Sequence, residues 1–198
     1  MMRIIHSMRH SQQEKLRSHD RIVEVAARRI REAGTDGPGV AEIMAEAGMT
    51  HGGFYKHFDS RDELVAEAAQ RACADGSHRL SETIAQAADP LAAMITGYLS
   101  TGHRDDPGTG CAVAALGGDV ARPDNAARGA YTEQVRRYIE GVTDLLGDEG
   151  ADGDRRRRAI ATVSAMVGAL VISRGVEDPA LSDEILEASR DALLGAAG

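Results

Sequence analysis

The sequence predicts an all-α protein of two domains with about nine helices. Apolar residues recur at helical spacing along most of the chain, and few segments show the alternation with period two that marks a β-strand. Aromatic residues make up only 3% of the 198 residues, and tryptophan is absent. This composition favours helices packed through Ala, Leu, Val and Ile over a β-sandwich.

A helix, a tight turn and a second helix are predicted between residues 40 and 58. Val40, Ile43 and Met44 share one helical face, and Gly48 suits the left-handed residue that ends many helices. Thr50 suits the N-cap of the second helix. This order of elements is the signature of a DNA-binding helix-turn-helix.

The second helix is predicted to bury one face and to present the other. Phe54 and Phe58 stack at i and i+4 on the buried face. Gly52 and Gly53 leave bare backbone on the exposed face, at a cost of roughly 0.5 to 1 kcal/mol each relative to alanine, which close approach to base edges would justify. The alternative is a loop followed by a short amphipathic helix with solvated polar side chains.

The segment from Gly48 to Leu64 resembles a motif of the TetR/AcrR family of bacterial transcriptional regulators. It reads Gly-Met-Thr-His-Gly-Gly-Phe-Tyr-Lys-His-Phe-Asp-Ser-Arg-Asp-Glu-Leu. The family pattern is Gly-Val-Ser-x-Gly-x-Leu-Tyr-x-His-Phe-x-Ser-Lys-x-x-Leu. The resemblance covers about the first third of the chain; the remainder agrees only in length and helical character.

The resemblance implies a homodimer that binds a near-palindromic double-stranded DNA operator and that an unknown small-molecule inducer releases. Matched position by position, it implies base-edge contacts from His51, Gly52, Gly53 and Lys56, and DNA-backbone contacts from Thr50, Tyr55, His57 and Arg61. The chain departs from the family at Gly39, where Thr or Ser is common, and at Ala41, where Arg is frequent. We therefore expect the second helix and Arg61 to carry more of the DNA contact.

Three segments are predicted along the chain. Residues 1–17 form a flexible basic leader without periodicity, which is either a disordered terminus or an arm for the minor groove. Residues 18–62 form a three-helix DNA-binding domain, whose first helix begins at Ser18 or Asp20 and ends at Gly34. Residues 63–198 form the ligand-binding and dimerisation domain.

The charge of the chain is unevenly distributed. Of its 23 Lys and Arg and 31 Asp and Glu residues, ten basic and eight acidic residues lie at or before Arg61. The rest of the chain is therefore strongly acidic, with 13 basic and 23 acidic residues. DNA contact is expected to be local to the N-terminal domain.

The C-terminal domain contains the candidate residues for ligand or redox sensing, Cys111, Tyr98 and Tyr131. Cys111 follows a Pro/Gly-containing loop and enters a short apolar helix, where it is either a buried structural cysteine or a sensor thiol. Residues 148–154 read as an acidic, glycine-rich loop. The apolar segment 160–173 and the final helix, about residues 181–194, are predicted to pair with their copies in a second subunit, the alternative being an intramolecular core.

Other function classes are disfavoured. The apolar segment 160–173 is too short and interrupted for a membrane span, and we expect a cytoplasmic protein. Two cysteines form no disulfide framework. His103, Asp105, Asp106 and Cys111 match no metal-ligand spacing, so no cofactor, metal or enzymatic activity is expected; a metal-dependent enzyme and a ligand-binding dimer without an operator are the alternatives.

Overall fold

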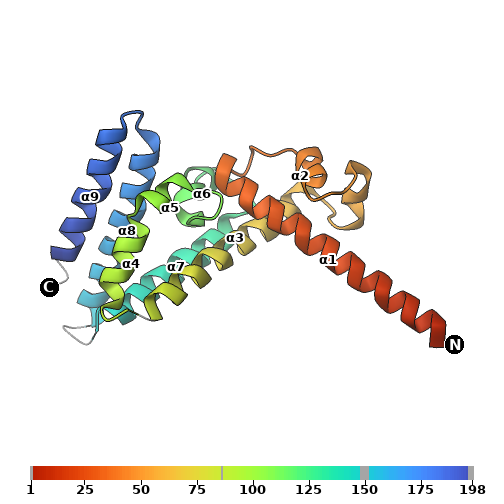
Figure 1. Cartoon of the computed structure of the whole chain (residues 1–198), viewed down its shortest axis with the longest axis horizontal. Helices are drawn as coiled ribbons and strands as arrows, with labels where there is room; N and C mark the ends of the chain where they lie inside the picture. Colours follow the sequence, from red (N-terminus) through yellow and green to blue (C-terminus); the bar gives the residue numbers. More distant parts are fainter. Residues whose placement is uncertain (1, 86, 148–151, 196–198) are drawn as a thin grey trace.

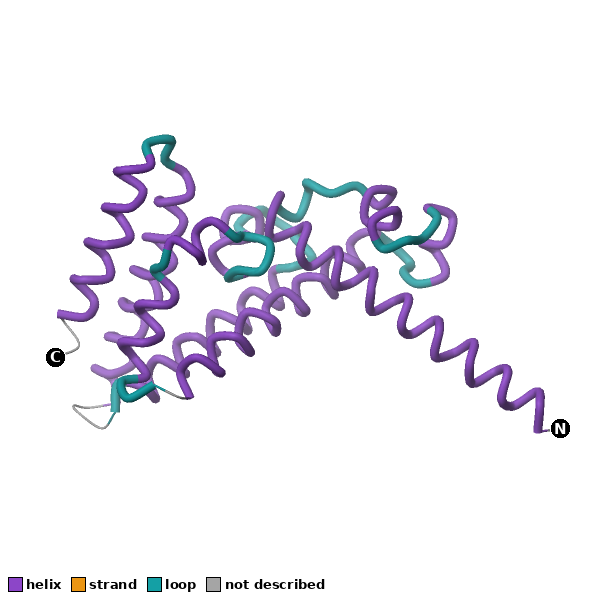
Figure 2. Tube along the Cα trace, in the orientation of Figure 1, coloured by secondary structure: helices purple, strands orange, loops and turns teal. Residues whose placement is uncertain are grey.

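The structure, a computed structural model, describes residues 2–85, 87–147 and 152–195. Within these ranges all regular structure is helical (Figure 2), which confirms the predicted fold class. The elements are α1 (Met2–Ala33), α2 (Val40–Glu46), the short 3-10 helix η1 (His51–Lys56), α3 (Arg61–Ala85), α4 (Pro90–Tyr98), α5 (Thr101–Asp105), α6 (Ala112–Val120), α7 (Arg128–Leu145), α8 (Asp152–Gly175) and α9 (Pro179–Gly195).

Helix α1 runs through the segment that was predicted to be a flexible leader. It continues unbroken from Met2 to Ala33, so neither Ser18 nor Asp20 caps its start. Figure 1 shows its N-terminal part projecting away from the other helices. Residues 12–17 are exposed, and Gln, Glu, Lys, Leu and Arg sustain the helix there by local propensity. The prediction was wrong because a helix without a buried face shows no periodicity.

The first hydrophobic core joins α1, α2, η1, the first half of α3, and α6. Phe58, Ile22 and Leu64 are among its fully buried members. The core extends along α3 as far as Cys73, beyond the domain boundary predicted at residue 62. The helix-turn-helix therefore packs on the same long helix that leads into the C-terminal half, and α6 closes this core from the C-terminal side.

The second core joins α4, α7, α8 and α9 with the start of α6. Ile95, Leu99 and Leu170 are fully buried within it. Tyr131 of α7 packs against both cores. Figure 1 places α8 and α9 side by side at the end of the molecule opposite the N-terminal part of α1.

Helix α8 is longer than its predicted apolar segment. By length and composition alone, the helix Gly153–Gly175 could cross a membrane. The core helix of a soluble protein passes the same test, so one such helix is weak evidence for a membrane span. The predicted segment 160–173 forms only part of this helix. Together with α9, it leaves large apolar side chains exposed at Ile160 (42%), Val171 (45%), Ile172 (55%) and Leu181 (42%).

Two helix ends confirm the boundaries predicted at Gly34 and Gly48, which both adopt positive φ. Gly147 adopts a positive φ after α7 in the same way. The side chain of Asp89 accepts a hydrogen bond from the Ala92 N–H (2.9 Å), with Pro90 as the first residue of α4. Helix α7 starts at Arg128 and ends at Leu145. The predicted acidic loop lies largely outside the described residues, at 148–151.

Candidate DNA-binding surface and ligand cavity

The turn between α2 and η1 is fixed by backbone geometry. Gly48 has a φ of +76°, and the N–H of Met49 donates to the carbonyl of Met44 at 2.8 Å. These contacts form the tight turn that the sequence predicted after α2. They direct the chain into η1 with its N-terminus facing solvent.

The second helix of the motif is a 3-10 helix, not the expected α-helix from Thr50 to Phe58. The N–H of Gly53 donates to the carbonyl of Thr50 at 2.9 Å, and the N–H of His57 donates to the carbonyl of Phe54 at 2.9 Å. Two successive glycines weaken an α-helix, which accounts for this short, tight form. Thr50 occupies the N-cap position with extended backbone, but its side chain accepts no capping hydrogen bond. Its exposed hydroxyl is available to a partner outside the chain.

Two phenylalanines hold η1 on the first core, as predicted. Phe54 and Phe58 are 2% and 1% exposed, and their rings lie 5.5 Å apart. The ring of His19 in α1 stacks on Phe58 at 4.6 Å, and its Nε2 lies 2.8 Å from a carboxylate oxygen of Glu67 in α3. Helices α1 and α3 thus fix the orientation of η1.

The outer face of η1 is open to solvent. His51, Gly52, Tyr55 and Lys56 are exposed, and the exposed fraction of Tyr55 reaches 74%. Tyr55 meets the ring of Phe54 edge-on at 5.2 Å, so its position is set from below while its hydroxyl remains accessible. A Cβ on Gly52 would meet nothing within 4 Å, whereas a Cβ on Gly53 would contact Met44 and Thr50. The predicted base-edge residues therefore share one surface, with Gly53 more recessed.

His57 is less outward-facing than predicted. Its side chain is half-buried between η1 and α1, and its Nδ1 is buried without a hydrogen-bond partner. Burial lowers the pKa of His57, and the neighbouring His19, Lys15 and Lys56 lower it further. The ring is therefore held neutral, which argues against a charged contact to phosphate from this residue.

Arg61 stabilises the protein itself. Its guanidinium donates to the carbonyl of Thr35 at 2.6 Å and to that of Pro38 at 3.4 Å. Both acceptors lie in the turn between α1 and α2. These hydrogen bonds position the helix-turn-helix, and the DNA-backbone contact that the resemblance implied for Arg61 stays a prediction.

Two further basic residues lie near the exposed face of η1. Lys15 is exposed on α1 and close enough to His57 to lower its pKa. Arg21 is also exposed, and its Nη1 would lie 4.0 Å from a Cβ on Gly48. Lys15 belongs to the predicted basic leader, because an exposed helix shows no apolar periodicity. Its spacing of four residues from His19 becomes meaningful only on a continuous helix.

The candidate sensing residues meet at a cavity of about 210 Å³ in the C-terminal half. Tyr98 and Cys111 line it, as expected, and Tyr138 joins them from α7. Tyr131 is not among its lining residues; it lies on α7 between the two cores. Residues 131 and 138 lie on nearly the same face of α7, two turns apart, so sequence periodicity alone does not identify which tyrosine reaches the cavity.

Cys111 is the N-cap residue of α6 and is only 3% exposed. Its N–H donates to Nε2 of His103 at 3.0 Å, and Nδ1 of the same ring lies 2.7 Å from the carbonyl oxygen of Tyr98. The carbonyl only accepts, so the proton resides on Nδ1 and the imidazole is neutral. Burial lowers the pKa of His103, and Arg174 lowers it further. His103 therefore joins the end of α4 to the start of α6.

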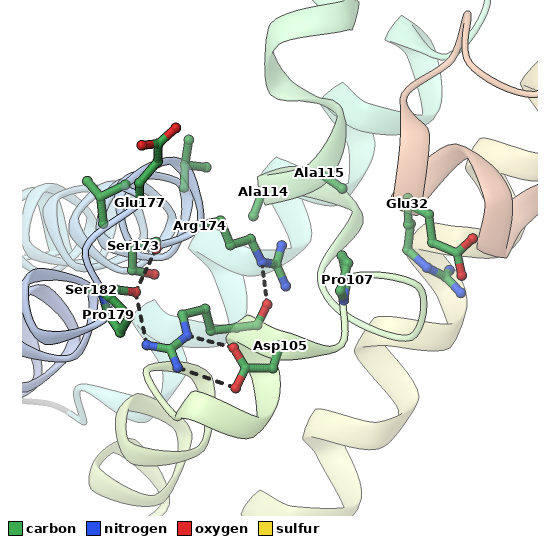
Figure 3. A pocket seen from close by; sticks show the side chains of 14 residues that line it. Glu32, Asp105, Pro107, Ala114, Ala115, Ser173, Arg174, Glu177, Pro179 and Ser182 are labelled. Carbon is green, nitrogen blue, oxygen red and sulfur yellow. Dashed lines mark hydrogen bonds and ion pairs between the residues drawn. The ribbon is translucent and has the colours of Figure 1, made fainter.

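A second, more open pocket of about 580 Å³ lies between α1, α5, α6 and the α8–α9 turn. Arg104 donates to Asp105 at 2.7 Å and to the hydroxyl of Ser182 at 2.9 Å, and Arg174 donates to the carbonyl of Arg104 at 3.0 Å (Figure 3). Arg104, Asp105 and Arg174 therefore already have partners within the chain. This makes the pocket a weaker candidate ligand site than the smaller cavity.

No group of three or more His, Cys, Asp or Glu residues that could hold a metal ion occurs in the described ranges. Cys73 is buried in the first core, and burial raises the pKa of its thiol to about 11. At neutral pH this thiol is protonated and poorly nucleophilic.

Residues 22–68 match the family described as bacterial regulatory proteins, tetR family. This segment begins within α1, at residue 22, and includes the C-terminal part of that helix, the helix-turn-helix and the start of α3. Over this segment the chain is similar to the tetR family. The matched range includes the motif that carried the resemblance in the sequence.

Similar proteins extend the likeness in fold beyond this segment. The HTH-type transcriptional repressor DhaR of Mycobacterium sp. (strain GP1) is 25% identical over 121 residues, which cover 61% of this chain and 60% of that repressor. A TetR-family regulator from Chloroflexus aurantiacus J-10-FL superposes with a TM-score of 0.77 at 20% identity, covering 91% of this chain and 94% of that one. NemR of E. coli, in its reduced form, gives a TM-score of 0.73 at 19% identity, covering 89% and 94%. At these identities the structural matches establish the shared fold.

Proposed function

We propose that this TetR-family chain is a homodimeric repressor that binds operator DNA through η1 and is released by a small molecule. The observation that carries the proposal is the exposed face of η1, where His51, Gly52, Tyr55 and Lys56 stand above the buried anchors Phe54 and Phe58. A rigidly held, exposed element of this size suits the major groove. Its place of action is the cytoplasm, where chromosomal DNA is found.

The apolar surface of α8 and α9 supports dimerisation. Val171, Ile172 and Leu181 are large apolar residues exposed on adjacent helices. A second copy of the same pair of helices would cover them in an isologous four-helix interface. Such a dimer presents two η1 elements to half-sites about 34 Å apart on a near-palindromic operator.

Helix α6 links the cavity to the DNA-binding half. Hydrogen bonds to that half are made both by the loop before α6 and by its last turn. Before its first turn, Gly108 accepts a hydrogen bond from Nε of Arg31 in α1 at 2.6 Å. In its last turn, Asp119 accepts a hydrogen bond from the N–H of Thr35 at 2.7 Å. Cys111 of the cavity is the N-cap of this helix. A ligand that shifts α6 would thereby favour a conformer whose two η1 elements no longer match the groove spacing.

The proposal is tested by incubating the purified full-length protein with fragmented genomic DNA of its own organism and sequencing the retained fragments. Fragments that share a near-palindrome, with half-sites about one helical turn apart, would support an operator-binding dimer. Retention without a shared sequence would favour the alternative of a ligand-binding dimer without an operator. The departures at Gly39 and Ala41 motivate that alternative.

A further inference from the structure

We infer that the cavity between α3, α4, α5 and α7 binds a small uncharged molecule through an oxygen atom that accepts a hydrogen bond from Tyr98. This inference rests on the proposed ligand control of DNA binding and assigns the chemical class of that ligand. It draws on the size of the cavity, on the hydrogen-bonding groups that line it and on the glycines at its wall.

The size of the cavity restricts the ligand. Its volume is about 210 Å³. One water occupies about 30 Å³ in the liquid, so the cavity accommodates a molecule of about seven non-hydrogen atoms. This is smaller than the usual pockets for drug-sized ligands.

The hydroxyl of Tyr98 is the group that requires a partner. The residue is 5% exposed, and its oxygen is buried beside the Cys111 thiol without a hydrogen bond of good geometry in the described part of the chain. A buried polar group without a partner costs free energy, so an orphan hydroxyl in a cavity wall indicates a missing acceptor. The neighbouring hydroxyl of Tyr138, 3.5 Å from the Cys111 Sγ, is a second donor at the same place.

The hydrogen-bonding groups of the cavity wall, the two tyrosine hydroxyls and the His103 ring, are uncharged. The guanidinium of Arg174 acts on Tyr98 from nearby, but it is already hydrogen-bonded to the carbonyls of His103 and Arg104. Burial raises the pKa of Tyr98 and of Tyr138 well above the ordinary tyrosine range, so both retain their protons. His103 is held neutral by its contacts with Tyr98 and Cys111. The carboxylate of Asp106 is exposed and accepts hydrogen bonds from the backbone and hydroxyl of Thr109. The donors therefore favour a neutral carbonyl-type oxygen over a carboxylate or an ammonium group.

Glycines keep the cavity open. Gly76, Gly97, Gly102 and Gly110 all line it. A Cβ on Gly76 would lie 3.6 Å from the Tyr138 hydroxyl, in ordinary van der Waals contact. Gly76→Ala would thus place a methyl group at the donors without a clash, and alanine is the better helix former on α3. This substitution therefore narrows the site without threatening the fold.

The test uses cyclohexanone as an uncharged acceptor of about seven non-hydrogen atoms, a size set by the cavity volume. Its binding to the full-length protein is titrated by ligand-observed NMR, with cyclohexanecarboxylate and cyclohexylammonium as charged analogues. We expect saturable binding of the ketone alone. Tyr98→Phe should weaken binding roughly five- to tenfold, since one hydrogen bond is lost. Gly76→Ala should also weaken it, because the added methyl group reduces the space for the ligand beside the Tyr138 hydroxyl.

Gly141→Ala is the matched control, because Gly141 is an exposed helical glycine on α7 whose added Cβ would meet nothing within 4 Å. It should bind the ketone as the wild type does. Tyr98→Phe should melt at the same or a higher temperature than the wild type, because an unpaired buried hydroxyl is removed. This separates loss of a ligand contact from loss of packing.

Three results would overturn the inference: no saturable binding of cyclohexanone to the wild type, equal binding to wild type and Tyr98→Phe, or charged analogues that bind as well as the ketone. DNA binding by the same preparations is measured separately. Ketone binding without DNA binding would refute the operator proposal alone, and DNA binding without ketone binding would refute this inference alone.

Discussion

The carboxylate of Asp119 accepts a hydrogen bond from the backbone N–H of Thr35 at 2.7 Å, which ties the last turn of α6 to the turn between α1 and α2. Thr35 is 2% exposed, and its other polar groups are also satisfied: Arg61 donates to its carbonyl and Asn125 to its hydroxyl. A Cβ on the preceding Gly34 would lie 2.5 Å from an oxygen of Asp119. The two halves of the molecule thus meet through a fully hydrogen-bonded turn where glycine allows the close approach.

This arrangement predicts that Arg61→Ala destabilises the protein in the absence of DNA. Two backbone carbonyls would lose a charged donor, and we expect a loss of about 1 to 3 kcal/mol in the free energy of unfolding. Urea titration measures it, with Arg122→Ala as a control that removes only an exposed ion pair to Asp36. If Arg61→Ala leaves stability unchanged and lowers the salt dependence of DNA binding, Arg61 is instead a phosphate contact.

Lys56 and Tyr55 are predicted to contribute to DNA affinity by different physical means. Lys56→Ala removes an exposed charge and should reduce the slope of log K against log salt by about one unit per lost phosphate contact. Tyr55→Ala should weaken binding to all sequences by about 1 to 3 kcal/mol with little change in that slope. Anisotropy titrations over a range of salt concentrations separate the two effects. If neither variant alters affinity, η1 is not the DNA-binding element.

Gly52→Ala tests how closely the backbone of η1 approaches DNA. The added Cβ would meet nothing within 4 Å in the protein, so thermal stability should be unchanged or slightly higher. If base edges lie against this backbone, the methyl group should weaken specific binding while non-specific binding persists. Gly141→Ala provides the matched control on a distant exposed helix face. Wild-type affinity in Gly52→Ala would show that the backbone at this position stays away from the bases.

Stability should fall as the solution is acidified through the titration range of His103. Its pKa in the folded protein is lowered from 6.5, chiefly by burial and also by Arg174. The unfolded chain then binds more protons, so the contribution is fully present above about pH 6.5 and is lost below it, down to the lowered folded pKa. Urea unfolding at several pH values should show a smaller acid loss in His103→Gln than in the wild type. An identical pH profile in both would exclude this contribution.

Ile172→Glu should disrupt the homodimer. In the single chain the Ile172 side chain is 55% exposed on α8. In the proposed four-helix interface a glutamate at this position would be a buried, unpaired charge, which is costly. Analytical ultracentrifugation should report a monomer or a much weaker dimer. Ala74→Glu, on an exposed position of α3, should leave association unchanged. A dimer of wild-type strength in Ile172→Glu would place the subunit interface elsewhere.

Local sequence signals predicted much of this fold. Gly34 and Gly48 end helices in the left-handed conformation, and Phe54 with Phe58 anchors η1. Each of these features depends on residues close in sequence. The family motif located the exposed residues of η1 in the same way. These features need no knowledge of distant contacts.

Features that depend on distant partners were not predictable in this way. Arg61 lies next to a helix-turn-helix and therefore resembled a phosphate contact, but its acceptors are carbonyls 23 and 26 residues earlier. His57 lies close to Lys15 and His19 because α1 begins earlier than predicted. The cavity tyrosine on α7 is Tyr138, not Tyr131, because tertiary packing decides which end of that helix reaches Cys111.

The central claim, that the exposed face of η1 binds a specific operator, is tested most directly by fluorescence anisotropy. The purified protein is titrated against DNA from its own upstream region and against a scrambled duplex, each at two salt concentrations. Tight binding of the upstream DNA alone, at one or two dimers per site and lost in the Tyr55→Ala and Lys56→Ala double variant, is the predicted result. Equal, weak and salt-sensitive binding of both duplexes, unaffected by the double variant, would contradict the claim.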